Sequence, residues 1–274
     1  MSVGSRGKVD TAWLARLRAR VAQPPLRARV PFMVESDGDA AIVGSVESIL
    51  LEGLEHLRLG DGRPLLHSGS DGWLLRGDAV DGLHRLAHAL RDAGLAHVWR
   101  DEQLAVDDAQ DRRIATVERA VVRPLGITTH AVHLVGFDPA GHVWLQQRAF
   151  TKPNDPGLWD TLMGGMVSAE DDHDAALARE TWEEAGLVVT ELQDLRYGGR
   201  VTIRRPASDA GGKGYVVEHI DWSACTVPAG MAPANQDGEV ERFELLAPAQ
   251  VIERLHADAF TDEAALILVA ALSA

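Results

Sequence analysis

The sequence predicts an α/β protein in which helices pack on a mixed sheet, preceded by a small α+β region. From residue 127 onward the patterns follow the order strand, strand, helix, strands and helix, an order typical of a sheet covered by helices. The composition is that of an ordinary globular protein, with 46% hydrophobic and 25% charged residues. A length of 274 residues allows one large domain or two of usual size. Because the pattern changes near residue 120, we expect two domains, 1–120 and 121–274.

The front region combines helical and extended patterns. Residues 11–23 carry apolar side chains at helical spacing, and residues 78–94 form an amphipathic pattern between an aspartate and a glycine. No grouping of catalytic residue types occurs here, so the region is expected to be an accessory domain. It could bind a partner, form a homodimer or cover the substrate pocket. Extended segments are predicted at 31–36, 40–46 and 72–78, and a hairpin at 97–108.

The second region contains more strands. Residues 129–149 predict two strands around the turn at 138–141, and an acidic segment at 172–185 predicts a helix. The glycine-rich stretch 204–215 is expected to be a mobile loop. Further strands are predicted at 215–222 and 238–246, and closing helices at 247–260 and 261–273.

Charge and composition exclude several classes of protein. With 41 acidic and 27 basic residues, the net charge is −14, whereas general nucleic-acid binding needs a basic surface. The longest apolar run, 264–272, is too short to cross a membrane. A single cysteine, Cys225, rules out an internal disulfide and a cysteine-based zinc site. The first thirteen residues have no apolar segment like that of a signal peptide. We therefore expect a cytoplasmic protein.

The acidic helix places three carboxylates together. At 100° per residue, Glu180, Glu183 and Glu184 fall within an arc of about 100°. Like charges at this spacing destabilise a helix by about 0.2–0.5 kcal/mol per pair, and acids near a helix C-terminus face the negative end of its dipole. Such a cluster suits a hard divalent cation, since Mg²⁺ takes oxygen ligands and shares them with substrate phosphates. The sequence therefore predicts a metal site on this face.

The opposite face of the same helix is expected to pack on the sheet, with Trp182 as its anchor. Arg179 lies one turn before Glu183, so the guanidinium is expected to pair with that carboxylate.

The acidic helix and its flanks resemble the signature of the Nudix hydrolases, G-x5-E-x7-R-E-U-x-E-E-x-G-U, where U is apolar. Two positions depart from it, because Asp171 replaces the first glutamate and Thr181 replaces an apolar residue. The segment PGLWDTLMGG before the signature also resembles the family. The matching positions are Gly165, Arg179, Glu180, Glu183, Glu184, Gly186 and Leu187.

This resemblance implies an α/β/α sandwich that binds Mg²⁺ or Mn²⁺ and cleaves a diphosphate joined to another group. The implied metal ligands are Glu180, Glu183 and Glu184, with Asp171 as a weaker candidate. Arg179 and Glu183 are the implied catalytic residues within the signature, and Gly164 and Gly165 are expected to lie against the substrate.

Further site residues are expected outside the signature. A general base is needed to activate water, and Glu239 is favoured over Glu241 and Glu218 because Glu239 follows a flexible Asp-Gly turn. Positive side chains are expected to meet the diphosphate. The favoured ones are Arg148 and Lys152, ahead of Arg204 and Arg205.

The histidines are not expected to form a metal site. His130 and His133 lie three residues apart on a predicted strand and so point to opposite faces, while His173 and His219 stand alone in the sequence.

The wider sequence resembles one branch of the family, related to the Nudix portion of thiamine pyrophosphokinase-associated proteins and carrying an extra N-terminal domain. The segments 118–137, 145–167, 214–219 and 235–246 carry this likeness. It implies removal of phosphate from thiamine diphosphate or its oxidised analogues, giving the monophosphate. Alternatives are hydrolysis of nucleoside diphosphate derivatives such as ADP-ribose, or a non-catalytic metabolite-sensing module. Isopentenyl diphosphate isomerases share the fold but use a cysteine in a context that Cys225 does not match.

Overall fold

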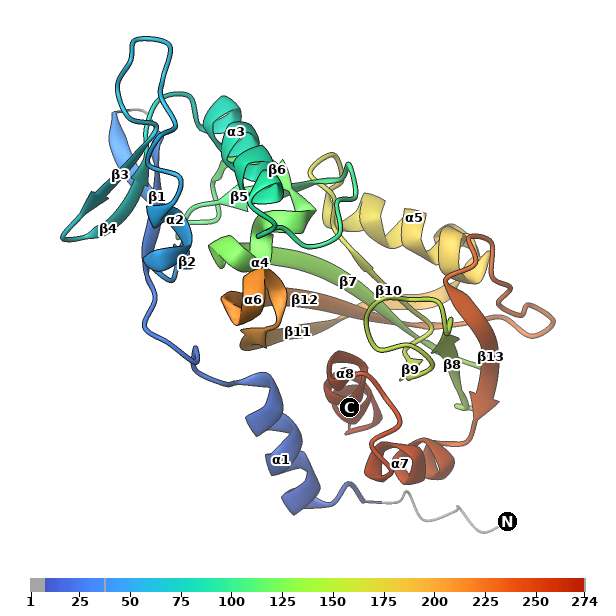
Figure 1. Cartoon of the computed structure of the whole chain (residues 1–274). Helices are drawn as coiled ribbons and strands as arrows, with labels where there is room; N and C mark the ends of the chain where they lie inside the picture. The colour runs from blue at the N-terminus through green and yellow to red at the C-terminus, as the bar shows by residue number, and fades with distance from the viewer. Residues whose placement is uncertain (1–7, 37, 274) are drawn as a thin grey trace.

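The computed structural model describes residues 8–36 and 38–273, and it shows a mixed α/β protein (Figure 1). The first seven of the residues inspected for a signal peptide lie outside the described part. The predicted α/β class with mixed sheets is confirmed. No helix within the described residues is long and apolar enough to cross a membrane.

The front region is built on a four-stranded sheet with the order β2-β1-β4-β3, in which β1 and β4 run parallel. Helix α3 covers it, and the predicted amphipathic helix is confirmed. Asp78 caps that helix by accepting a hydrogen bond from the amide of Asp81 at 2.8 Å. The elements are α1 (Thr11–Val21), β1 (Val30–Ser36), β2 (Asp39–Val46), α2 (Ile49–Glu52), β3 (Leu66–Gly69), β4 (Gly72–Leu75), α3 (Ala79–Asp92), β5 (Gln103–Asp107) and β6 (Arg113–Glu118).

A short linking segment joins the core of the front region to the larger sheet. It consists of the 3₁₀ turn Arg119–Val121 and helix α4 (Val122–Leu125). Val122, Leu125 and Ile127 are buried in the same apolar cluster as the side chains of the front sheet. The front core thus extends past residue 120, and the division into 1–120 and 121–274 stays a prediction.

The second region is a seven-stranded mixed sheet with the order β11-β12-β7-β8-β13, in which β10 pairs with β7 and β9 with β8. Strands β12 and β7 are parallel, and the neighbouring pairs are antiparallel. The strands are β7 (Thr128–Phe137), β8 (Val143–Arg148), β9 (Trp159–Asp160), β10 (Met163–Met166), β11 (Gln193–Ala207), β12 (Gly214–Thr226) and β13 (Val240–Leu246).

Helices cover both faces of this sheet, so the predicted α/β/α sandwich is confirmed (Figure 1). Alternate side chains of β7 point to opposite faces. Val132 and Leu134 pack under α5, while Ala131 and Val135 pack with the other helices. The covering helices are α5 (His173–Ala185) on one face and α1, α7 (Pro248–His256) and α8 (Asp262–Ser273) on the other.

Two sequence predictions about irregular segments were wrong. Residues 204–215 form no long loop, because β11 runs to Ala207, the short helix α6 (Asp209–Gly212) follows, and β12 starts at Gly214. Most side chains of β11 are exposed. The segment therefore lacks the alternation of apolar and polar residues from which a strand is predicted. The predicted hairpin at 97–108 lies instead at 103–118, where β5 pairs with β6.

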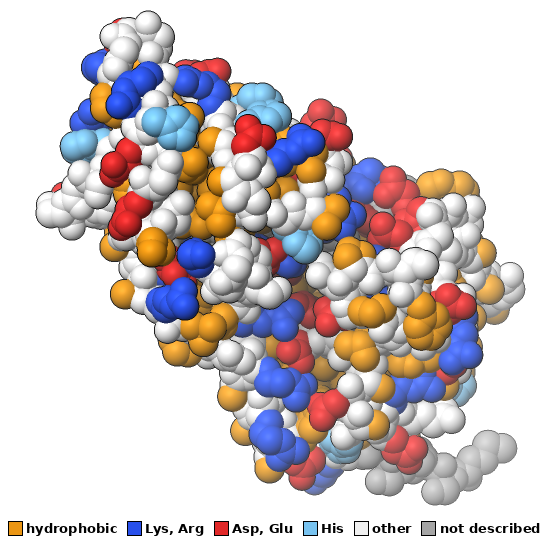
Figure 2. Space-filling model, in the orientation of Figure 1, with side chains coloured by type: hydrophobic (Ala, Val, Ile, Leu, Met, Phe, Trp, Pro, Cys, Tyr) orange, Lys and Arg blue, Asp and Glu red, His pale blue; other side chains and the backbone are white. Residues whose placement is uncertain are grey.

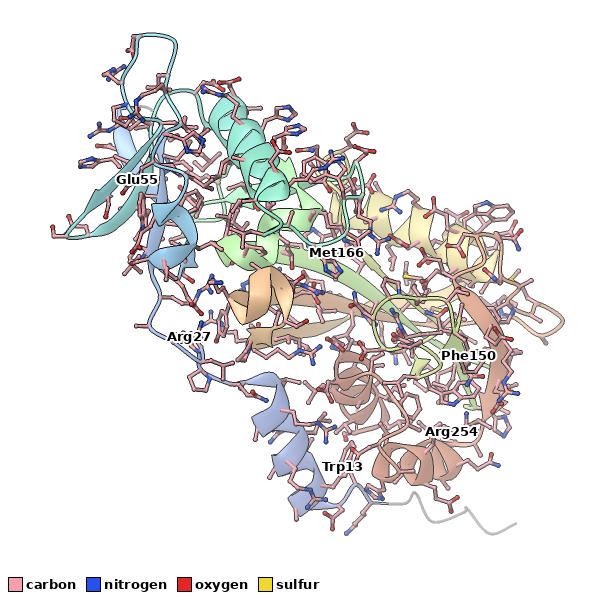
Figure 3. The ribbon with its side chains drawn as sticks, in the orientation of Figure 1. Trp13, Arg27, Glu55, Phe150, Met166 and Arg254 are labelled. Atoms are coloured by element: carbon pink, nitrogen blue, oxygen red, sulfur yellow. The ribbon has the colours of Figure 1, made fainter. Side chains whose placement is uncertain are left out.

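The first helix packs on the last one rather than on the front sheet. Trp13 and Leu17 are buried among side chains of α7 and α8, and Trp13 points toward those helices (Figure 3). The indole Nε1 of Trp13 donates to Asp258 at 3.1 Å, and Arg20 pairs with Asp262 at 2.9 Å. Helix α1 therefore completes the core beneath the larger sheet.

This packing generates a stability prediction. Leu17→Ala should lower the free energy of unfolding by about 2–5 kcal/mol, because a fully buried leucine leaves a cavity. Arg16→Ala, on the exposed side of the same helix, should stay within about 0.5 kcal/mol of the natural protein. Urea unfolding followed by circular dichroism measures both, and equal effects would show that α1 is not packed as described.

Candidate active site

A cleft of about 800 Å³ lies along one side of the larger sheet, a volume typical of a small-molecule site. Acidic and basic side chains both line it. Figure 2 shows acidic and basic side chains interspersed over one face of the molecule. Its walls come from separate parts of the chain: the signature helix α5, the segment 151–155, the ends of β11 and β12, the turn 237–239, and the linking segment of the front region.

Helix α5 forms where the sequence predicted it. Asp172 caps its start by accepting from the amide of Ala175 at 2.8 Å. Gly186 ends it in the left-handed conformation, with φ of 62°, which suits glycine. The helix therefore stops one residue after the acidic cluster, and the cluster sits in its last two turns.

Glu184 is the most enclosed member of the cluster, with 1% of its surface exposed. Its carboxylate accepts from Gln146 Nε2 at 2.8 Å and from the amide of Gly164 at 3.0 Å, and it pairs with Lys152 Nζ at 3.4 Å. Burial raises the pKa of Glu184, and the contacts with Lys152, Gly164 and Gln146 act in the opposite direction. Three donors thus hold this side chain in one orientation.

Arg179 holds the rest of the acidic cluster. Its NH1 donates to Glu180 Oε1 at 2.9 Å and to Glu183 Oε2 at 3.0 Å, so the predicted pairing with Glu183 is present. Its Nε donates to Asp171 Oδ2 at 2.9 Å. Burial and then the charge of nearby Glu184 raise the pKa of Glu180 to about 7. The single positive charge of Arg179 therefore does not compensate the negative charge of the surrounding carboxylates.

The prediction for the packed face of α5 was wrong at Trp182. That side chain is 52% exposed, whereas Ala176, Leu177, Thr181 and Ala185 are buried. The helix is rotated so that Glu184 points toward the sheet. Burial of Glu184 is possible because Gln146 and Gly164 satisfy its oxygens, a compensation that a helical projection does not show.

Two glycines allow the strand beside α5 to approach the cluster. A Cβ atom at Gly165 would lie 2.0 Å from Cδ of Glu180, and one at Gly164 would lie 2.5 Å from the ring of His133. Both glycines line the cleft. The missing side chain at Gly165 leaves room for the Glu180 carboxylate above β10, and the missing side chain at Gly164 leaves room for the ring of His133.

The donor set fits a divalent ion that is shared with a substrate. Within residues 8–36 and 38–273, no three His, Cys, Asp or Glu side chains are preformed as a metal site. Arg179 instead donates to Asp171, Glu180 and Glu183. Mg²⁺ commonly uses one or two carboxylates together with substrate phosphates and water. Glu180 and Glu183 can provide these, since both line the cleft.

The candidate base lies opposite the cluster and is joined to it through a lysine. Lys152 Nζ forms an ion pair with Glu239 as well as with Glu184. Partial burial opposes ionisation of Glu239, but the ion pair with Lys152 outweighs it and lowers the pKa. Glu218 also lines the cleft, whereas Glu241 does not.

Of the basic side chains expected at the diphosphate, three line the cleft and one does not. Arg148, Lys152 and Arg205 line the cleft, and Arg204 does not. Arg148 pairs with Asp160 at 3.5 Å and donates to the backbone oxygen of Asn154 at 3.2 Å. Asp171 is held by Arg179 and is not among the cleft-lining residues, so its role as a metal ligand stays a prediction.

The cleft contains residues that sequence reasoning did not find. Asp160 lies on strand β9 and His133 on β7, and Gln146 on β8 donates to the cleft residue Glu184 without lining the cleft itself. Their proximity depends on strand pairing. His133 Nδ1 lies 2.9 Å from Thr161 Oγ1. The front region adds Arg100, Glu102, Arg119 and Arg123.

His173 and His219 stand alone in the sequence, but the fold brings both of them to His130. The ring centroids of His173 and His219 each lie 5.8 Å from the ring centroid of His130. His133 contacts Thr161 instead, so the predicted separation of His130 and His133 is confirmed. The three-histidine group depends on the parallel pairing of β7 with β12.

Comparison with known proteins shows which family the chain belongs to. The NUDIX domain profile matches residues 128–267, slightly more than half of the chain. The chain belongs to the NUDIX domain family. The superfamily and the enzyme class expected from the sequence are therefore confirmed.

The relatives of this Nudix protein share limited identity with it. An uncharacterized protein of Saccharomyces cerevisiae is 24% identical over 83% of this chain and 70% of its own length. An uncharacterized Nudix hydrolase of Pseudomonas aeruginosa is 36% identical over 31% of this chain and 51% of its own. An isopentenyl-diphosphate Delta-isomerase of Serratia proteamaculans is 35% identical over 35% of this chain and 52% of its own. The chain thus spans about half the length of the last two.

The single cysteine generates one prediction. Cys225 lies on β12, buried in the apolar cluster that α5 covers, and burial raises the pKa of its thiol to about 12. Because the thiolate is the reactive form, iodoacetamide at pH 8 should label the protein only after unfolding. Mass spectrometry of native and urea-treated samples measures this. Rapid labelling of the native protein would contradict the buried position and favour isomerase-like use of the cysteine.

The glycine beside Glu180 generates a second prediction. Gly165→Ala should displace the flexible end of Glu180 and reduce hydrolase activity by about 10²-fold, as small misplacements of reacting groups do. The melting temperature should change little. The control is Gly60→Ala, where an added Cβ meets nothing within 4 Å. Full activity of Gly165→Ala in phosphate release would show that the position of Glu180 does not matter.

Proposed function

We propose that this Nudix protein is a Mg²⁺- or Mn²⁺-dependent hydrolase that cleaves a diphosphate linkage in a small metabolite. One observation carries the proposal: three carboxylates of α5, a candidate base and several basic side chains line the same cleft. The cleft has room for both a diphosphate and the organic group attached to it.

The metal, when bound at Glu180 and Glu183, would neutralise the phosphoryl oxygens and lower the pKa of a water molecule. The residues of the chain supply the rest. Glu184 is held by Gln146 and Gly164, so the glutamates are oriented before substrate arrives. Such preorganisation lowers the cost of reaching the transition state.

The link between Lys152 and Glu239 suggests how the base acts. In the absence of substrate the ammonium group of Lys152 is paired with both Glu184 and Glu239. A bound phosphate would compete with Glu239 for the ammonium group of Lys152. Loss of this ion pair would raise the proton affinity of Glu239. Glu239 would then accept a proton from the attacking water. The water oxygen bonds to the terminal phosphorus, and the bridging oxygen leaves with the monophosphate.

For the substrate we propose thiamine diphosphate or its oxidised analogues, converted to the monophosphate and orthophosphate. The support is the likeness of the wider sequence to the thiamine pyrophosphokinase-associated branch. Nucleoside diphosphate derivatives such as ADP-ribose, and a non-catalytic sensing role, are the alternatives. We further propose a cytoplasmic protein with two domains, 1–120 and 121–274.

The test is a panel of diphosphates assayed with and without Mg²⁺. Thiamine diphosphate and its oxidised analogues should release orthophosphate only with metal, and Glu183→Gln should reduce the rate by at least about 10²-fold because it weakens the metal site. Glu191→Gln is the matched control, since Glu191 is exposed and lies outside the cleft-lining residues.

Other outcomes separate the alternatives. Preferential cleavage of ADP-ribose would overturn the thiamine assignment and leave the hydrolase proposal standing. Tight binding of a metabolite without turnover of any diphosphate would overturn the hydrolase proposal.

A further inference from the structure

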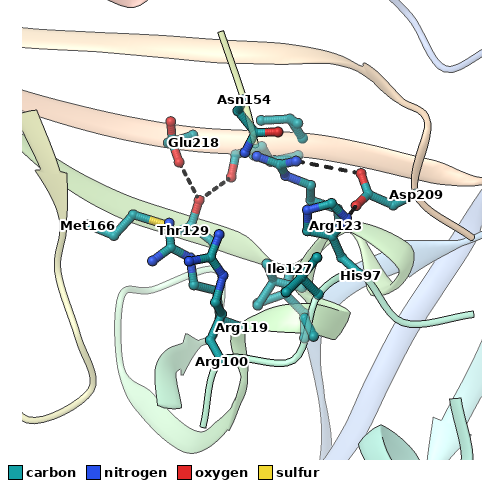
Figure 4. Close-up of a pocket in the computed structure, with 15 residues that line it drawn as sticks. His97, Arg100, Arg119, Arg123, Ile127, Thr129, Asn154, Met166, Asp209 and Glu218 are labelled. Carbon is teal, nitrogen blue, oxygen red and sulfur yellow. Dashed lines mark hydrogen bonds and ion pairs between the residues drawn. The ribbon is translucent and has the colours of Figure 1, made fainter. Parts of the chain in front are cut away.

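A side pocket opens from the cleft where the front region meets the larger sheet. It shares Arg100, Arg119, Arg123, Met166 and Glu218 with the main cleft. Its remaining walls come from residues 97–98 of the front region, from the linking segment and the start of β7, from Asn154 and Asp209, and from strand β12 (Figure 4). Residues from both regions of the chain therefore enclose one continuous space.

The side pocket is adjacent to the acidic cluster, and Met166 connects the two. The side chain of Met166 lines the side pocket, while its backbone oxygen accepts from Arg179 NH2 at 3.3 Å. Met166 also directly follows Gly164 and Gly165 on β10. A ligand with its diphosphate at α5 would thus place the attached group near this pocket.

The front wall of the side pocket is held in place by contacts with the Nudix region. The amide of Ala169 donates to the oxygen of Gln103 at 2.8 Å, and Arg113 donates to the oxygen of Ala169 at 3.1 Å. Arg119 NH1 pairs with Glu102 at 2.7 Å, and Arg123 pairs with Asp209 at 3.6 Å. The contacts of Ala169 tie the front region to the loop before α5, and the Arg123–Asp209 pair ties the linking segment to helix α6 before β12. The Arg119–Glu102 pair holds the linking segment to the front region itself.

The pocket combines an apolar wall with a fixed carboxylate. Val122 and Ile127 are buried and Val216 is half-buried, and all three line it. The hydroxyl of Thr129 donates to Glu218 Oε1 at 3.1 Å. Within the described residues no hydrogen bond is made to the other carboxylate oxygen, Oε2, so it can accept from a ligand.

Guanidinium groups complete the lining. Arg119 lies beside Thr129 and Met166, with Arg100 next to it (Figure 4). Guanidinium planes stack on aromatic rings, and the thioether of methionine makes favourable contacts with them. Asp209, which also lines the pocket, is engaged by Arg123 and His97. A slot with one apolar wall, stacking groups and the free acceptor of Glu218 matches a planar heteroaromatic ring that carries an amino group.

Resting on the proposed function, we propose that the front region determines specificity: the side pocket holds the amino-substituted heteroaromatic ring of the diphosphate substrate. Glu218 accepts from the amino group of the ring, Thr129 positions Glu218, and Arg119 stacks on the ring. Of the three roles left open by the sequence, the front region then serves to cover the pocket. Glu218, once a candidate base, has a recognition role.

Binding of ring compounds without a diphosphate tests this inference apart from catalysis. Thiamine carries an aminopyrimidine and adenosine an aminopurine, and calorimetry on the full chain measures their affinity without metal. At least one should bind, and Thr129→Val should weaken it by about tenfold, the value of a hydrogen bond to a charged group. Thr129→Ser keeps the hydroxyl and should bind like the natural protein.

Two further variants and a control sharpen the result. Glu218→Gln should weaken binding by at least about tenfold, because it also removes a hydrogen bond to a charged group. Asn154→Trp should abolish binding, because Asn154 lines the pocket and the larger side chain would fill it. Glu253→Gln, on the exposed side of α7, should have no effect. Tighter binding of thiamine would indicate a substrate with an aminopyrimidine, and tighter binding of adenosine would indicate one with an aminopurine.

The failures of the two proposals can be told apart. Equal affinities in the natural protein, Thr129→Val and Glu218→Gln, or no binding of either ring compound, would overturn the side-pocket inference even if diphosphates are hydrolysed. Ring binding that depends on Thr129 and Glu218, without release of phosphate from any diphosphate, would leave this inference standing and overturn the proposed hydrolase function.

Discussion

The repulsion among three carboxylates on one helix face is the constraint on which the site depends. Glu180, Glu183 and Glu184 lie within one turn and a half of α5, and burial of Glu184 makes their mutual repulsion stronger than it would be in water. Arg179 and Lys152 offset it on opposite sides. A divalent ion and a phosphate together would replace these contacts, because the ion takes the carboxylates and the phosphate takes the cations.

The sheet makes this arrangement possible. Strand β10 approaches α5 without side chains at Gly164 and Gly165, and β8 supplies Gln146 to the one glutamate that points inward. Apolar clusters on both faces of the sheet support these strands, and the first and last helices of the chain close one of them. The acidic helix therefore rests on a core that can hold its charges in position.

The front region is joined to the site rather than separated from it by a linker. The apolar core beneath the front sheet continues through α4 to Ile127, directly before β7. The same segment projects arginines into the cleft. A region without catalytic residue types of its own thus forms part of the wall around the candidate active site.

Local periodicity was enough to predict the acidic helix and a mixed sheet with helices packed on it, because helix and strand patterns and the spacing of the carboxylates are properties of neighbouring residues. The α/β/α sandwich was implied by the resemblance to the Nudix signature. Local periodicity could not determine the rotation of α5, where Trp182 lies outside and Glu184 inside, since partners from two other strands stabilise that orientation. The meeting of Lys152 with Glu239, the grouping of His130 with His173 and His219, and the front-region arginines in the cleft were also decided only by the tertiary structure. These contacts join residues distant in sequence, and they depend on strand order and register.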